Sequence, residues 1–115
     1  MLNTLQGEWE VIHAESNGKA ISTDKFSSTY LIFQGNLLIP DNYPDDPAEV
    51  RLDPDKKPPW IDLSPRSEER MLGIYRIDGS RLIICLSTEG NSRPVKFKTS
   101  PDTDTYLMEL RKKMQ

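Results

Sequence analysis

The chain has 115 residues, of which 36% are hydrophobic and 29% are charged. This length suits a single domain with a modest core. The formal net charge of −3 argues against nucleic acid and anionic membrane surfaces as partners, because both require a basic face.

The chain opens with residues 1–6, which lack the charged and apolar regions of a signal peptide. We therefore expect a cytoplasmic location, or a secreted one if a signal peptide has been removed. Residues 2–6 are predicted to form one helical turn, and residues 8–15 a strand. Strict alternation along that strand places Trp9, Val11 and His13 on one face.

Further short strands are separated by turn and loop signals rich in Gly, Asn, Asp and Pro. A second helical turn is predicted within residues 22–28, and a proline-interrupted acidic loop over residues 40–47. The predicted strands outside the chain's centre cover residues 29–34, 37–39, 49–52, 60–63, 95–99 and 105–112.

The central stretch, residues 71–87, carries the clearest structural signal. Two apolar runs flank an Asp-Gly pair at positions 78 and 79, which predicts a β-hairpin because Gly accepts the positive φ of a tight turn. A two-residue turn at the pair places Ile77 opposite Ser80, whereas a three-residue turn places Ile77 opposite Arg81. Both faces of the hairpin are apolar, so we expect both to be covered.

No segment sustains a helical period over a dozen residues, while short strands recur at intervals of about ten residues. This pattern predicts an all-β fold, either a sandwich or a barrel.

The first strand begins with Gly7-Glu8-Trp9, which resembles the Gly-x-Trp signature of lipocalins. More specifically, the chain resembles a family of small, uncharacterised lipocalin-like domains abundant in planctomycete bacteria. The similarity covers nearly the whole chain. The matching stretches are residues 5–9, 52–58, 61–63, 72–75, 78–79 and 93–94, with Leu82, Cys85 and Phe97.

The resemblance implies one domain over residues 1–115, a small antiparallel lipocalin/calycin-like barrel or half-barrel of about eight short strands. It implies no established activity. In lipocalins the signature Trp plugs the closed end of the barrel, and a basic residue after the last strand lies across its ring. The resemblance thus marks Gly7, Trp9 and Arg111 as structural residues, with Lys112 as the alternative to Arg111.

Four residues are candidates for ligand binding. Trp9 has a large ring, although a core role is the competing interpretation. Tyr30 and Tyr75 combine an aromatic body with a polar tip, which suits the mouth of a pocket, but they also suit a packed core. Arg93 precedes a proline and is expected either to meet an anionic group at the barrel rim or to be a solvated loop residue.

The remaining chemistry-bearing residues favour no catalytic or metal site. Cys85 lies between apolar residues and is expected to be a buried, inert thiol. His13 is the only histidine, so a His-based metal site or a Ser-His-Asp triad lacks most of its parts. The acidic segment 41–46 could offer oxygen ligands to calcium, but it matches no EF-hand spacing and Pro44 interrupts it. With no phosphate loop or nucleophile elbow either, we expect no enzyme activity and no cofactor.

The favoured function is non-catalytic binding of a small apolar or amphipathic ligand inside the barrel. The alternative is a protein–protein interaction module that uses the barrel surface or rim loops. Cavity size separates the two: an interior filled by Trp9, Phe33, Ile74 and Phe97 would exclude the ligand, and a pocket of a few hundred cubic ångströms would support it.

Overall fold

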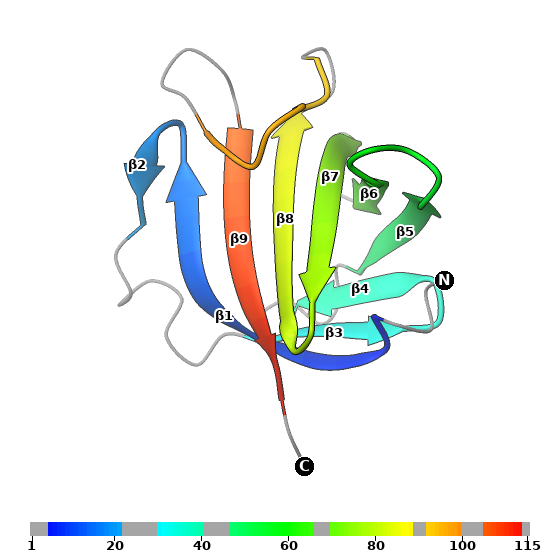
Figure 1. Ribbon diagram of the computed structural model, residues 1–115. Helices are drawn as coiled ribbons and strands as arrows, with labels where there is room; N and C mark the ends of the chain where they lie inside the picture. Colours follow the sequence, from blue (N-terminus) through cyan, green and yellow to red (C-terminus); the bar gives the residue numbers. More distant parts are fainter. Residues whose placement is uncertain are drawn as a thin grey trace.

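The computed structural model describes residues 5–21, 30–40, 47–65, 70–88, 92–99 and 105–113. These residues form nine β-strands and no helix, and so contain no helix that could cross a membrane (Figure 1). The strands are β1 (Gly7–Ser16), β2 (Lys19–Ala20), β3 (Tyr30–Gln34), β4 (Leu37–Pro40), β5 (Ala48–Asp53), β6 (Trp60–Pro65), β7 (Met71–Asp78), β8 (Arg81–Thr88) and β9 (Thr105–Lys112). The predicted turn within 22–28 and most of the one over 2–6 lie outside the described residues.

Eight of these strands, β1 and β3–β9, close into an antiparallel barrel, and β2 extends the edge of β1. Closure depends on β1, which pairs with β3 through Gly7–Glu10 and with β9 through Trp9–Ser16. Barrel closure removes the unpaired edges that an open sheet would leave. The predicted all-β barrel is therefore confirmed.

A β-bulge interrupts β1 between Val11 and His13. A bulge adds one residue to one strand, so the alternation of faces changes beyond it. Trp9, Val11 and Ala14 are consequently the buried residues of β1, and the prediction that His13 shares their face is wrong. The His13 side chain is instead half-exposed, with its Nε2 2.9 Å from Oε2 of Glu15.

The central hairpin of β7 and β8 follows neither predicted register, and its two-residue turn lies one residue later than the predicted two-residue turn. Asp78 pairs with Arg81, which leaves Gly79 and Ser80 as the two turn residues. Gly79 has a φ of +63° and takes the first turn position, where a type II′ turn requires a positive φ. Relative to the predicted two-residue turn, this shift changes every cross-strand partner by two residues. Each side chain therefore stays on its predicted face of the hairpin.

Both faces of the hairpin are covered, as predicted. Inside the barrel, Leu82 and Ile84 belong to the main core with Trp9 and Phe33. On the outer face lies a second cluster of buried residues, Ile74, Cys85 and Leu107, packed with Trp60, Ile83 and Phe97.

Residues 92–99 do not form the predicted strand at 95–99. β8 pairs directly with β9 over seven residues, so the sheet has no place for a strand between them. The segment instead crosses the outer face of β8 and β9 near one end of the barrel (Figure 1). Phe97 packs on the outer cluster, whereas Val95 is 76% exposed.

Candidate ligand-binding site

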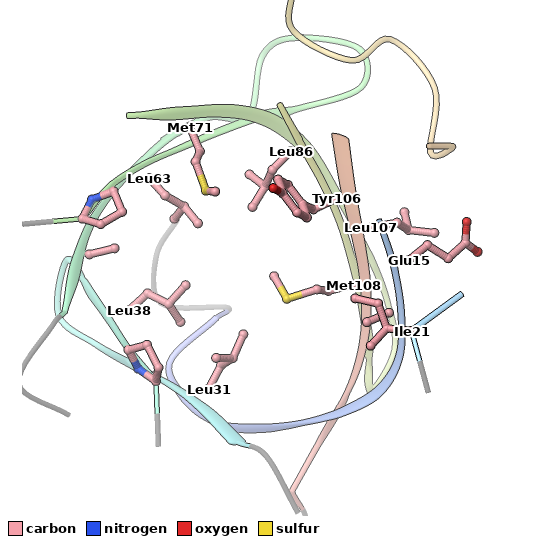
Figure 2. A pocket seen from close by; sticks show the side chains of 14 residues that line it. Glu15, Ile21, Leu31, Leu38, Leu63, Met71, Leu86, Tyr106, Leu107 and Met108 are labelled. Atoms are coloured by element: carbon pink, nitrogen blue, oxygen red, sulfur yellow. The ribbon is translucent and has the colours of Figure 1, made fainter. Parts of the chain in front are cut away.

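A cavity of about 380 Å³ lies in the barrel, and Trp9 is not part of its wall. All eight strands of the barrel contribute to this wall, with most side chains pointing inward (Figure 2). It is lined by Ala14, Glu15, Ile21, Leu31, Leu38, Pro40, Ala48, Leu63, Pro65, Met71, Leu86, Tyr106, Leu107 and Met108.

The side chains of the cavity wall differ from those of the main core in size. Trp9 and Phe33 are almost fully buried in the core and do not line the cavity. Ala14 and Ala48, with small side chains, are part of its wall. Of the four residues proposed to fill the interior, Ile74 and Phe97 lie in the outer cluster instead.

Trp9 is buried in the main core and does not line the cavity, which fits the structural role expected for it and lends no support to a role in ligand binding. The ring is 1% exposed, and its Nε1 donates a hydrogen bond to the Leu5 carbonyl at 2.8 Å. The Lys112 ammonium lies 5.6 Å from the ring centroid, within the range of a cation–π contact. Lys112 thus takes the position first expected for Arg111, which forms an ion pair with Glu10 at 2.7 Å.

Gly7 begins β1 with a φ of +116°, a conformation that residues with a side chain rarely adopt. An added Cβ would lie 3.7 Å from Cε of Lys112, which is an ordinary contact. The backbone conformation, and not a lack of space, therefore favours Gly here, and this supports its structural role.

Neither tyrosine proposed for the pocket lines it. Tyr75 is buried in the main core, where burial first and the charge of Asp53 second raise the pKa of its phenol above the usual value. Tyr30 is half-buried, and Nζ of Lys113 lies 5.0 Å from its ring centroid. The packed-core interpretation fits Tyr75.

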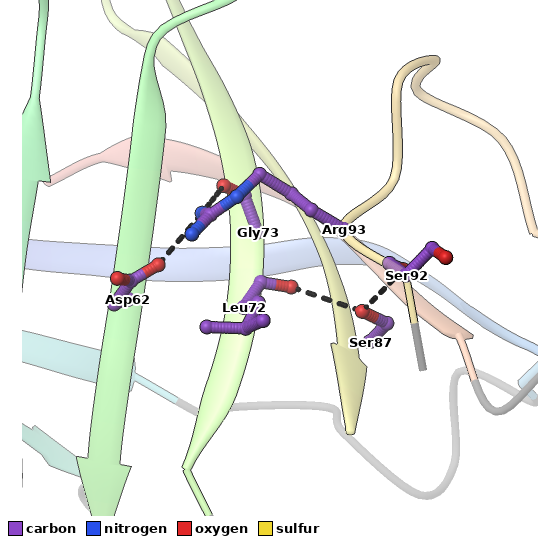
Figure 3. Close-up of polar contacts among 6 residues, drawn as sticks. All are labelled: Asp62, Leu72, Gly73, Ser87, Ser92 and Arg93. Atoms are coloured by element: carbon purple, nitrogen blue, oxygen red, sulfur yellow. Dashed lines mark hydrogen bonds and ion pairs between the residues drawn. The ribbon is translucent and has the colours of Figure 1, made fainter. Parts of the chain in front are cut away.

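Arg93 lies on the outer face of the barrel, where its side chain is largely buried and does not line the cavity. Its Nη1 donates to Oδ1 of Asp62 at 2.6 Å and to the Gly73 carbonyl at 2.8 Å (Figure 3). The guanidinium also lies 4.0 Å from the ring centroid of Trp60, with the Lys56 ammonium 4.7 Å from the same ring. We call these contacts of Arg93 the Arg93 clamp.

Further contacts fasten residues 92–99 to the barrel. The buried Ser87 hydroxyl lies 2.9 Å from the Ser92 carbonyl (Figure 3), and the Thr99 hydroxyl donates to Glu15 at 3.2 Å. Cys85 lies beneath the segment, with its sulfur 3.7 Å from the Lys98 carbonyl. Cys85 is fully buried, and this burial raises the pKa of its thiol, as expected for an inert side chain.

The described residues contain no group of three or more His, Cys, Asp or Glu side chains that could hold a metal ion. The acidic segment 41–46, considered above for calcium, lies outside them.

The four residues predicted for ligand binding include none of the fourteen residues of the cavity wall, among them Met71, Tyr106 and Met108. A signal was present, because the alternation of residues 105–112 places Tyr106 and Met108 on one face together with the core residue Leu110. The Tyr106 ring points into the cavity (Figure 2), and its hydroxyl forms no hydrogen bond with another described residue.

No family model matches the chain, and neither a curated protein nor a solved structure shows significant similarity to it. The resemblance to lipocalin-like domains therefore stays a prediction from sequence motifs.

Proposed function

We propose that this protein is a non-catalytic binding domain of the lipocalin-like type that holds a small apolar or amphipathic molecule inside its barrel. The observation that carries the proposal is the apolar cavity of about 380 Å³. Protein pockets for small molecules typically measure about 300–1,000 Å³ and have mainly apolar walls.

The volume limits the ligand to a modest size. An apolar cavity of about 150 Å³ accommodates benzene, so this cavity has room for roughly a dozen carbon atoms. Two fused rings or a medium-length acyl chain would fit.

The alternative, a protein-interaction module, has less support from the surface. Among the described residues, the exposed large hydrophobic side chains are Ile77 and Val95. Ile77 lies near the hairpin turn and Val95 on the segment that crosses β8 and β9 at the other end (Figure 1). Two separated side chains do not form the contiguous apolar patch that marks an interface.

A fluorescence titration with 1-aminonaphthalene tests the proposal, because this two-ring dye is within the size limit and its emission changes in an apolar site. Ala48 lines the cavity, so Ala48→Leu fills part of it and is expected to weaken dye binding at least tenfold. Ala20 is exposed on β2, so Ala20→Leu is the matched control and is expected to leave the affinity unchanged. Thermal melts establish that both variants are folded. The proposal fails if the dye does not bind, or if folded Ala48→Leu binds it as well as the unaltered protein does.

A further inference from the structure

The described wall of the cavity offers no cation to a ligand. Its residues include neither Lys nor Arg, and its one charged member is Glu15. The Glu15 side chain points away from the centre of the cavity (Figure 2), where its two oxygens contact His13 at 2.9 Å and Thr99 at 3.2 Å. A carboxylate drawn into this interior would lose its water without gaining a counter-charge, which is strongly unfavourable.

One polar group does face the interior. The Tyr106 hydroxyl points into the cavity and has no hydrogen-bond partner among the described residues. A phenol donates readily to an alcohol or carbonyl oxygen, and such an oxygen carries little of the desolvation cost of a carboxylate.

On the basis of the proposed function, we infer that the cavity selects uncharged ligands with one oxygen that accepts a hydrogen bond from Tyr106. By the same inference, it rejects carboxylates of the same length. Apolar side chains supply most of the contact, and Tyr106 orients the polar end. The ligand class is therefore a medium-chain or two-ring alcohol, aldehyde or ketone, and fatty acids are excluded in their ionised form.

Calorimetric titrations of the full chain with 1-decanol and decanoate at pH 8 test the charge selectivity, because the two probes differ mainly in the charge of the head group. Decanol is expected to bind at least 30-fold more tightly. Decanoate affinity is expected to rise as the pH is lowered toward 5 and the free acid forms, while decanol affinity stays constant. If decanoate binds within threefold of decanol, the inference is wrong and the proposed function stands. If neither probe binds, both are wrong.

Tyr106→Phe tests the hydrogen bond separately. The variant is expected to bind decanol about three- to tenfold more weakly, in line with the net value of one hydrogen bond. Naphthalene, which has no hydrogen-bonding atom, is expected to bind the variant and the unaltered protein equally well. Unchanged decanol affinity in the variant would overturn the role assigned to Tyr106.

Discussion

Substitution of Arg93 distinguishes a structural role of this residue from a role in ligand binding. Substitution by Met keeps most of the aliphatic stem but removes the ion pair with Asp62, the hydrogen bond to the Gly73 carbonyl and the stacking on Trp60. The Arg93 and Asp62 side chains are 17% and 25% exposed, so solvent screens the pair only in part. Hydrogen bonds to charged groups contribute about 1.5–3 kcal/mol each and cation–π contacts about 0.5–2 kcal/mol. Because these contributions overlap, we expect Arg93→Met to lower the free energy of unfolding by about 2–4 kcal/mol.

Urea denaturation at 25 °C measures this loss as a lower midpoint at an unchanged slope. Arg76→Met is the matched control, because Arg76 lies 4.0 Å from Asp78 and both side chains are mostly exposed. Exposed pairs of this kind contribute little, so the control is expected to change stability by less than about 0.5 kcal/mol.

The same variant also reports on ligand binding. Arg93 lies on the outer face and does not line the cavity, so Arg93→Met is expected to change the affinity for 1-aminonaphthalene by less than twofold under conditions where the variant is folded. A stability loss no larger than that of Arg76→Met would refute the clamp. A tenfold weaker affinity in the folded variant would return Arg93 to the ligand-binding residues.

Three further predictions concern the core. In urea denaturation, Trp9→Ala should lower the free energy of unfolding by about 3–5 kcal/mol and Lys112→Ala by about 1 kcal/mol. Equal effects of the two substitutions would contradict a buried Trp9 ring with the Lys112 ammonium over it. Ile84 is fully buried and Ile83 half-buried, so Ile84→Ala should cost about 2–5 kcal/mol and Ile83→Ala clearly less, with the reverse order refuting the assigned faces. Burial raises the pKa of Cys85, so its thiol should label slowly in native protein. The contribution of the Cys85 thiol to folding stability should be complete below about pH 8.5, the pKa of an unfolded thiol, and should fall as the pH rises above that value. In thermal melts, Cys85→Ala should remove this part of the pH dependence.

Local patterns in the sequence were sufficient to predict most of the strands and the all-β class, because alternation and turn residues act over a few positions. They failed where pairing between strands distant in sequence determines which face a residue occupies. The bulge in β1 moves His13 off the core face, and only the pairing of β1 with β9 reveals it. Likewise, Val95 and Phe97 alternate as a strand would, but β8 already pairs with β9.

The candidate site was harder to predict than the fold. Tyr75 and Arg93 carry the residue types expected of a pocket, but their roles depend on which face of the sheet they occupy. Arg93 reaches Asp62 across 31 positions of the chain, a contact that no local pattern indicates. The cavity itself depends on a deficit of volume near Ala14 and Ala48, and volume inside a barrel is a property of all its strands together.

The most direct test of binding inside the barrel uses the methionine methyl groups as reporters. Met71 and Met108 are two of the four methionines, and both line the cavity. Protein labelled with ¹³C at the methionine methyl groups is titrated with 1-decanol, and the two signals are assigned through Met71→Leu and Met108→Leu. The account predicts saturable shifts of both signals with one common dissociation constant. It is contradicted if both signals stay unchanged up to the solubility limit of decanol.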